Sequence, residues 1–239
     1  MTRRRWIADE VSGDRAALVG EHAEHLSRVL RARIGQEFDI ATGEVVRRGR
    51  IVSVVDGRVE FDLAEEISDA QPAEITLLLA IFKFDRMEWA IEKCTELGVS
   101  RIVPVIARRT DSHLAAASAK RLERWQRLAR QAAEQSRRAS PPEIVAPAKF
   151  DDAIIPPQGV RIVLAESEEQ MLLRDVLNCD ANHQPVSLAI GPEGGWTKDE
   201  LKAFRNAGWI SASMGGTILR AETAAIAATA VVMSSLFAF

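Results

Sequence analysis

The sequence predicts an α/β chain in two parts, a small β-barrel followed by a larger part with a mostly parallel sheet. The chain has 239 residues, more than the roughly 100 to 200 residues of a usual single domain. Short apolar runs alternate with glycines before Pro72, and longer apolar runs alternate with helical patterns after it. We therefore expect one domain over residues 1–71 and a second over residues 72–239.

The first part shows the pattern of short strands separated by turns. Gly43, Gly49 and Gly57 separate its apolar runs, as turn residues do. The strands predicted from these runs cover residues 37–41, 50–55 and 58–63. One helix is expected over residues 21–31, because apolar side chains recur there at helical spacing.

The second part alternates strands with helices. Its apolar runs predict the buried strands of a parallel sheet, over residues 74–82, 101–106, 160–165, 186–190 and 209–213. A helix is expected over residues 85–97, where Cys94 shares the apolar face and is interpreted as a core residue. Thr197 and Glu200 have the spacing of a capping box, which predicts a helix from there to residue 206.

Composition and spacing exclude several classes of protein. Cys94 and Cys179 form no Cys-x-x-Cys pair, and the four histidines show no metal spacing. The N-terminus lacks the apolar core of a signal peptide, and the apolar stretch at residues 224–239 is shorter than the roughly 20 residues of a membrane span. We expect a cytoplasmic protein with no metal and no membrane segment.

The first candidate site element is a glycine loop at residues 191–195, between the strand predicted at 186–190 and the capped helix. Glycines let a ligand approach the backbone, whose N–H and C=O groups can read a purine edge or a ribose. A Walker loop is disfavoured, because no Gly-Lys-Ser/Thr follows. An ordinary tight turn between strand and helix is the alternative.

A second glycine turn lies at residues 213–219, before the last helix. Two such loops at the carboxyl ends of neighbouring strands would form the crevice in which open α/β sheets bind ligands. Arg220 and Glu222 lie at the expected start of the last helix. They either cap that helix or help to hold a cofactor or nucleobase.

Basic residues gather in one segment although the net charge of the chain is −3. Residues 101–149 hold eleven Lys and Arg against four acids, and arginines recur every third residue from Arg121 to Arg130. This helical face either tracks phosphates or is an ordinary solvated surface. Over residues 1–72, fourteen acids outnumber eleven arginines, so an RNA-binding role of the first part depends on local clustering.

Five segments, in their order along the chain, carry a family signature. They read HLSRVLR at residues 25–31, EKCTELGV at 92–99, EQS at 134–136, IGPEGG at 190–195, and ILR with ETA at 218–224. With these segments the chain resembles, over essentially its whole length, the RsmE family of 16S rRNA (uracil-1498-N3)-methyltransferases. Four residues depart from the family pattern. Gly216-Thr217 stands where many members carry Pro-Arg, Arg108 stands where an acid is common, and Arg137 replaces a usual glycine.

The resemblance implies an N-terminal PUA-like β-barrel that binds RNA and a C-terminal SPOUT domain tied in a trefoil knot. It also implies a homodimer that binds S-adenosylmethionine and acts on 16S ribosomal RNA in the small ribosomal subunit. The cofactor-binding residues expected on this basis are Ala189, Ile190, Gly191, Glu193, Gly194, Met214, Gly215, Ile218, Leu219, Thr223 and Ala224. The expected RNA-binding residues are Arg3, Arg4, Arg28, Arg31, Arg124 and Arg138.

The implied reaction needs a group that handles a proton. N3 of uracil is protonated at neutral pH, so the enzyme must stabilise the imide anion or remove the proton. The catalytic candidates are Arg109, Arg220 and Glu222. Two rival hypotheses are a SPOUT enzyme that methylates the ribose 2′-OH, and a non-catalytic RNA-binding factor that retains the knot but lost activity through the altered Gly216-Thr217 stretch.

Overall fold

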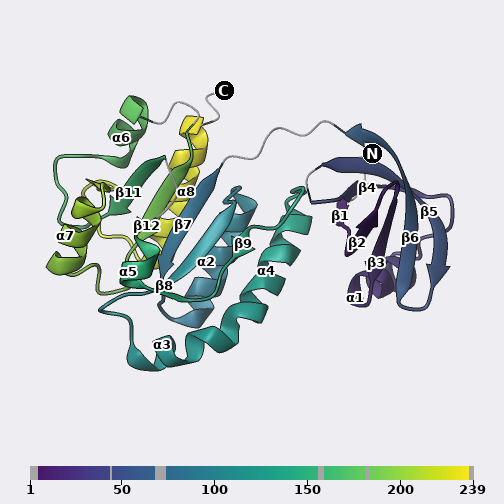
Figure 1. The fold of residues 1–239 in the computed structure, drawn as a ribbon, viewed down its shortest axis with the longest axis horizontal. Helices are drawn as coiled ribbons and strands as arrows, with labels where there is room; N and C mark the ends of the chain where they lie inside the picture. The colour runs from purple at the N-terminus through teal and green to yellow at the C-terminus, as the bar shows by residue number, and fades with distance from the viewer. Residues whose placement is uncertain (1–4, 44, 68–73, 156–158, 181–183, 237–239) are drawn as a thin grey trace. The chain divides into compact units, whose positions relative to one another are not determined.

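A computed structural model describes residues 5–43, 45–67, 74–155, 159–180 and 184–236. Contacts between residues divide the chain into two compact units (Figure 1). The first unit comprises residues 1–71 with 133–141, and the second comprises residues 72–132 with 142–239. The end of helix α4 (Leu122–Gln135) thus belongs to the first unit by its contacts, which no local sequence pattern indicated.

The first unit contains one sheet with the strand order β1-β4-β5-β6-β3-β2. Its strands are β1 Arg5–Ile7, β2 Glu10–Ser12, β3 Arg15–Val19, β4 Glu37–Ala41, β5 Val46–Val55 and β6 Arg58–Ile67. The pairs are antiparallel except that of β1 with β4. Residues 8 and 9 connect the two edge strands, β1 and β2, of this sheet. Ala8 N–H donates to Ala41 O of β4, and Asp9 N–H donates to Ala17 O of β3, each at 2.9 Å. The sheet is therefore curled into a half-barrel around an apolar core.

Two sequence expectations in this unit were wrong in detail. Gly49 does not end a strand, because β5 runs through it with a shift of register. Glycine is needed there since a Cβ would clash with the Ile40 side chain. The helix expected over residues 21–31 is shorter, with α1 at Glu21–Glu24 and a π-helical turn, η1, at His25–Val29. It ends there because Arg31 adopts a left-handed φ of 51°.

The second unit is built on a sheet with the order β10-β8-β7-β12-β11-β13, and β9 pairs with β8 off this path. Its strands are β7 Ile75–Ala80, β8 Arg101–Ile106, β9 Glu143–Ile144, β10 Ala148–Lys149, β11 Val160–Leu164, β12 Val186–Ile190 and β13 Ile210–Ala212. The described pairs in this sheet are all parallel. The predicted parallel sheet is thus confirmed, with β8 and β12 at their predicted bounds, whereas β9 and β10 were missed.

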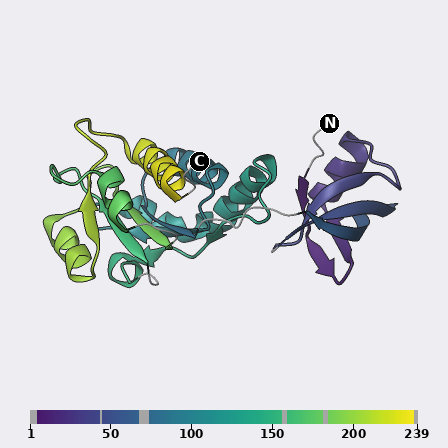
Figure 2. The same cartoon turned by 90° about the horizontal axis from the view of Figure 1, so that it is seen from above.

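Helices cover both faces of this sheet (Figure 2). Its helices are α2 Phe84–Glu96, α3 Ser112–Ser118, the 3₁₀ turn η2 Ala119–Arg121, α4, α5 Phe150–Ala153, α6 Leu173–Asp180, α7 Lys198–Asn206 and α8 Ala221–Leu236. On β7, Leu77 and Leu79 belong to the core under α2, α6 and α8, whereas Leu78 and Ala80 belong to the core under α5 and α7. The strand reads as a continuous apolar run because both of its faces are buried.

The last helix is part of the core, as the sequence predicted. Ala225, Ala228 and Val232 of α8 are buried against α2 and α6. Cys94 is also a core residue: its Sγ lies 3.6 Å from Thr229 Oγ1, and burial raises the pKa of its thiol to about 12. Within the described residues, no helix is long and apolar enough to cross a membrane. The trefoil knot stays a prediction.

Candidate functional site

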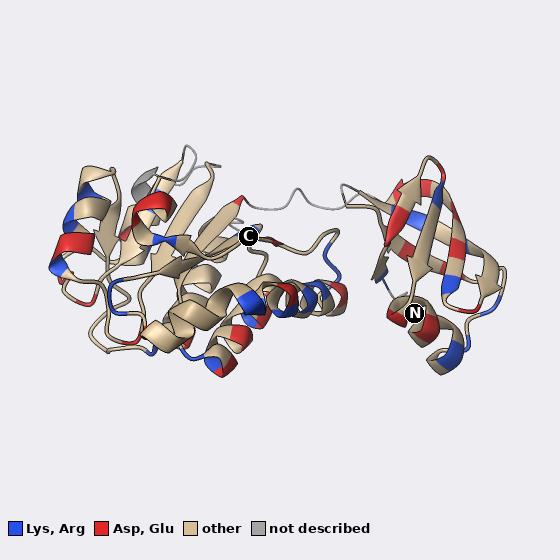
Figure 3. Cartoon of the chain, turned by 60° about the horizontal axis from the view of Figure 1, so that its bottom comes forward, with Lys and Arg blue, Asp and Glu red and all other residues tan. Residues whose placement is uncertain are grey.

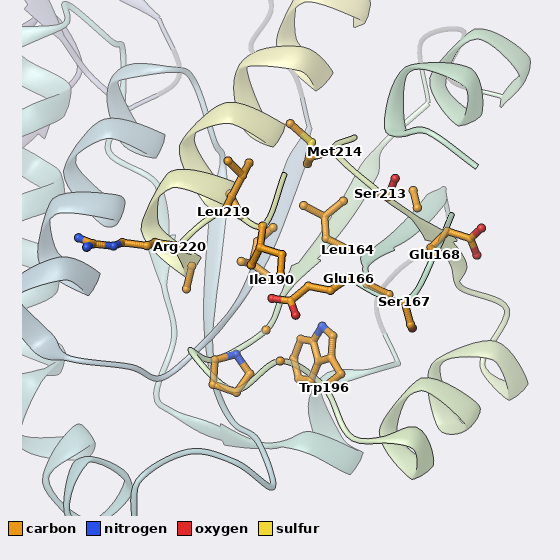
Figure 4. Close-up of a pocket in the computed structure, with 18 of the residues that line it drawn as sticks. Leu164, Glu166, Ser167, Glu168, Ile190, Trp196, Ser213, Met214, Leu219 and Arg220 are labelled. Carbon is orange, nitrogen blue, oxygen red and sulfur yellow. The ribbon is translucent and has the colours of Figure 1, made fainter. Parts of the chain in front are cut away.

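The two glycine loops line one cavity at the carboxyl ends of β11, β12 and β13 (Figure 4). Its volume is about 900 Å³, within the range of roughly 300–1,000 Å³ that is usual for small-molecule sites. The wall is formed mainly by residues 164–169, 190–196 and 212–221. The loops therefore lie together, which the predicted crevice requires.

The first loop is held by a tight turn and a buried tryptophan. Gly195 N–H donates to Pro192 O at 2.8 Å, and Gly195 has a φ of +68°, which glycine adopts at low cost. The ring of Trp196 is buried, with its centroid 5.8 Å from that of Phe150 and 5.0 Å from that of Phe204. This aromatic cluster anchors the loop where it enters α7.

The predicted capping box is confirmed, and it also places Arg109. Thr197 Oγ1 accepts from Glu200 N–H at 3.2 Å, and Glu200 Oε2 accepts from Thr197 N–H at 2.8 Å. Oε1 of the same buried carboxylate accepts from Arg108 N–H at 2.8 Å, which ties the loop after β8 to the start of α7. The Arg109 guanidinium consequently donates to Gly194 O in the first glycine loop.

The second loop is held to the segment that connects β11 with α6. Ser213 N–H donates to Met171 O, and Leu173 N–H donates to Ser213 O, each at 2.9 Å. Gly215 has a φ of +114°, and a Cβ there would meet nothing within 4 Å. Backbone conformation, and not crowding, therefore requires glycine at this bend. The loop ends at Arg220, whose carbonyl accepts from the N–H of Ala224 at 2.8 Å.

The cavity has an apolar part and a polar part. Figure 4 shows the side chains of Leu164, Ile190 and Leu219 grouped together, with Glu166 and Ser167 beyond them. Apolar side chains beside exposed backbone groups suit a purine, and polar side chains suit a sugar or a charged group. The cavity can therefore hold a nucleoside.

Arg86 on α2 reaches this site from a distant part of the chain. Its Nη1 lies 3.0 Å from Glu193 Oε1 in the first loop, and its Nε lies 3.7 Å from Glu222 Oε1 at the start of α8. The Glu222 side chain is 5% exposed, and its Oε2 has no hydrogen-bond partner among the described residues. Arg86 thus joins two segments that border the cavity.

Most of the residues predicted for the site line the cavity. They are Ile190, Gly191, Glu193, Gly194, Met214, Gly215, Ile218, Leu219, Ala224, Arg109 and Arg220. Arg220 is exposed and extends away from the centre of the cavity (Figure 4). Three other predicted residues lie outside the described lining. Ala189 is buried in the core under α5 and α7, Glu222 contacts Arg86, and Thr223 lines a shallow hollow between α2 and α8.

Sequence reasoning missed Arg86, Glu166 and Trp196. Glu166 carried a usable signal, because an acid directly after a strand of a parallel sheet lies at the ligand-binding edge. Arg86 carried none, since its partners are 107 and 136 positions away in the sequence.

Two of the predicted RNA-binding arginines are paired with carboxylates of the chain. Arg28 Nη2 donates to Asp56 Oδ1 at 2.8 Å, and Arg124 donates to both oxygens of Glu88 at 2.7 and 2.8 Å. These hydrogen bonds raise the pKa of both arginines. Figure 3 shows Asp and Glu interspersed with Lys and Arg within each unit taken by itself. Phosphates would have to compete with these acids.

The other predicted RNA-binding residues differ in exposure. Arg31 is exposed at the end of the π-helical turn. Arg138 is half-buried, and burial lowers its pKa to about 10. Arg3 and Arg4 lie outside the described residues. Arg31 is therefore the best placed of these residues to meet a phosphate.

The chain matches the family model of an RNA methyltransferase domain over residues 69–233. It is 34% identical over 212 residues to ribosomal RNA small subunit methyltransferase E of Synechocystis. The matched region covers 86% of this chain and 68% of that protein. It is 31% identical over 236 residues to the protein of the same name from Aquifex aeolicus. This matched region covers 96% of this chain and 98% of that protein.

Two solved structures resemble the whole chain. Ribosomal RNA small subunit methyltransferase E from Neisseria gonorrhoeae, bound to S-adenosyl methionine, has a TM-score of 0.85 at 28% identity and covers 98% of both chains. A Legionella pneumophila methyltransferase with bound S-adenosyl methionine has a TM-score of 0.84 at 27% identity, with the same coverage. Fold, site and family model together define an RNA methyltransferase. The chain belongs to the ribosomal RNA small subunit methyltransferase E family, as the five sequence segments indicated.

Proposed function

We propose that this protein uses S-adenosylmethionine to methylate N3 of a uridine in 16S ribosomal RNA of the small ribosomal subunit. The observation that supports this most is the cavity of about 900 Å³ walled by both glycine loops. We also propose that residues 1–71 form a PUA-like RNA-binding domain and residues 72–239 a knotted SPOUT domain. The cytoplasm, where small subunits mature in bacteria, is the proposed location.

The residues of the cavity fit S-adenosylmethionine. A Cβ at Gly191 would lie 3.2 Å from Trp196 Nε1, and a Cβ at Gly194 would lie 3.3 Å from Arg109 Cδ. Glycine at both positions avoids these close contacts, and it leaves the backbone N–H and C=O groups of the loop accessible to an adenine or ribose. When bound, the cofactor supplies a methyl group activated by a sulfonium.

Arg109 and Arg220 are the cations proposed to act on the uracil. Both line the cavity, and Arg109 is fixed by its hydrogen bond to Gly194 O. A cation near the uracil carbonyl oxygens stabilises the anion that forms when N3 loses its proton. Glu222 is buried beside Arg86, so we propose that it positions this arginine and does not accept the N3 proton.

The proposed reaction is tested by mapping methyl groups by mass spectrometry in unmodified small subunits incubated with the protein and S-adenosylmethionine. N3-methyluridine is the expected product. Arg220→Ala should lower the rate about 100-fold, as loss of a group that stabilises an oxyanion does. Arg205→Ala, at an exposed position of α7, is the matched control. A methyl group on ribose would instead support the 2′-OH enzyme, and failure to bind S-adenosylmethionine in calorimetry would support the non-catalytic factor.

A homodimer is proposed from a second surface of the α/β unit. Trp89 on α2 is 48% exposed, and it lines a shallow, mostly apolar hollow together with Ile226 and Ala230 of α8. Ile226 and Ala230 are partly buried, so Trp89 is the large exposed side chain of this hollow, and an exposed apolar side chain beside an apolar hollow suits an interaction surface. A second copy of the chain that covers this surface would pack its own α2 and α8 against α2 and α8 of the first copy.

A further inference from the structure

Glu166 stands in a turn that is fixed at both ends. Ala165 N–H donates to Ala212 O at 3.0 Å, and Glu168 N–H donates to Ala165 O at 3.1 Å. Glu166 therefore occupies a central position of the turn after β11, and Figure 4 shows its side chain directed into the cavity. Its Oε2 lies 4.0 Å from the Cβ position of Gly195, which places the carboxylate beside the first glycine loop.

The carboxylates that line the cavity differ in what they contact. Glu193 is ion-paired with Arg86, and Glu168 Oε1 accepts from two backbone N–H groups at 3.0 and 3.1 Å. The side chains of Glu166 and Glu169 make neither a hydrogen bond nor an ion pair with any described residue. Of the two, Glu166 is the one that is placed beside the first glycine loop. A ligand that fills the cavity removes water from this carboxylate, which costs free energy unless the ligand brings a positive charge.

We propose that Glu166 is the charge by which the protein distinguishes S-adenosylmethionine from its demethylated product, S-adenosylhomocysteine. This inference rests on the proposed function. The methyl donor carries a positive sulfonium, whereas the product carries a neutral thioether. A carboxylate in the cavity wall attracts the sulfonium and not the thioether, so it favours binding of the donor and release of the product. A hydrogen bond from Glu166 to the ribose, or an ion pair with the α-ammonium of the amino-acid part, would act on both ligands equally, because they share both groups.

Coulomb's law gives the size of the effect. Two unit charges about 6 Å apart, in a medium of dielectric constant about 40, attract each other enough to change an affinity about tenfold. That dielectric constant lies between the values for a protein surface and for water, which suits an exposed carboxylate. Glu166→Gln keeps the shape of the side chain and removes only its charge.

The experiment measures by calorimetry the dissociation constants of S-adenosylmethionine and S-adenosylhomocysteine for the full chain and two variants. In Glu166→Gln the preference for S-adenosylmethionine over S-adenosylhomocysteine should fall about tenfold. Asp199→Asn, at an exposed position of α7, removes the same charge outside the described lining of the cavity, and its preference should equal that of the unsubstituted chain.

Three outcomes would overturn the inference. Equal weakening of both ligands in Glu166→Gln would indicate a contact with the ribose or the α-ammonium, which both ligands carry. An unchanged preference would leave Glu166 without this role, and the same shift in Asp199→Asn would indicate a general effect of net charge. If the unsubstituted chain binds neither ligand, the proposed function fails as well, and that result is distinct from the other three.

Discussion

Arg86 is predicted to hold two borders of the cavity together, and Arg86→Met tests this role. Methionine keeps an unbranched apolar side chain but removes the guanidinium. The substitution leaves Glu222, whose side chain is 5% exposed, without its cation. Glu193 also loses its partner, but its side chain is 44% exposed and remains in contact with water. The cost should therefore come mainly from Glu222.

The size of this cost follows from the burial of the pair. Removing one partner of a fully buried ion pair costs about 3–5 kcal/mol. Arg86 is 31% exposed and its Nε lies 3.7 Å from Glu222 Oε1, so water screens the pair and the expected cost is about 2 kcal/mol. The exposed pair with Glu193 adds at most about 0.5 kcal/mol. The free energy of unfolding should fall by about 2–2.5 kcal/mol in total.

Urea denaturation followed by tryptophan fluorescence measures this fall, because all tryptophans except Trp6 lie in the α/β unit. The matched variants are Glu222→Gln and the double variant Arg86→Met/Glu222→Gln. The double variant should be about 1 kcal/mol more stable than Arg86→Met alone, since it no longer buries an uncompensated carboxylate. Additive losses in the double variant would refute the reasoning, because they would mean that the two side chains do not interact.

Binding of S-adenosylmethionine separates a positioning role of Arg86 from ordinary packing. In calorimetry, Arg86→Met should weaken binding about tenfold, because the first loop and α8 lose their common anchor. Arg86→Lys keeps the charge and should retain most of the affinity. A folded Arg86→Met variant that binds as well as the unsubstituted chain would show that the ion pairs leave the loops where they are.

Two further predictions concern α2. The pKa of the Cys94 thiol is raised by burial from 9.0 to about 12, so the stability linked to this group is complete below pH 9 and is lost as the pH rises toward 12. Cys94→Ala should flatten the fall of the urea midpoint in this window, and an unchanged slope would contradict the prediction. Trp89→Glu places a charge on the proposed dimer surface and should convert a dimer to a monomer in analytical ultracentrifugation. A Trp89→Glu variant that still sediments as a dimer would exclude this surface.

The parts of the fold that were predicted from the sequence are those with local signals. Strands β8 and β12 are mostly apolar because helices cover both sides of them, and turn residues bound these runs. The capping box at Thr197 needs only residues within one helical turn. Strand β2 was missed because its three residues are all exposed and show no apolar pattern, and β9 and β10 have only two residues each.

The same distinction applies to the site. The glycine loops were found because a left-handed bend at Gly195 or Gly215 requires glycine, and glycine is visible in a sequence. The ion pairs of Arg86 were not found because they join elements that only the tertiary fold brings together. Thr223 was predicted to bind the cofactor together with its neighbour Ala224. Successive side chains on a helix differ in direction by about 100°, so Thr223 lines the hollow between α2 and α8 while Ala224 lines the cavity.

The altered Gly216-Thr217 stretch bears on the rival hypothesis of a non-catalytic factor. Both residues are exposed at the cavity, and a Cβ at Gly216 would meet nothing within 4 Å. The bend itself depends on the left-handed Gly215 and on the hydrogen bonds that hold Ser213, neither of which involves residues 216–217. The departure from the family pattern therefore changes which side chains border the cavity without disturbing the loop that forms its wall. The intact bend keeps the wall of the cavity that binding of the methyl donor needs, so the altered stretch gives no support to a factor that has lost its cofactor site.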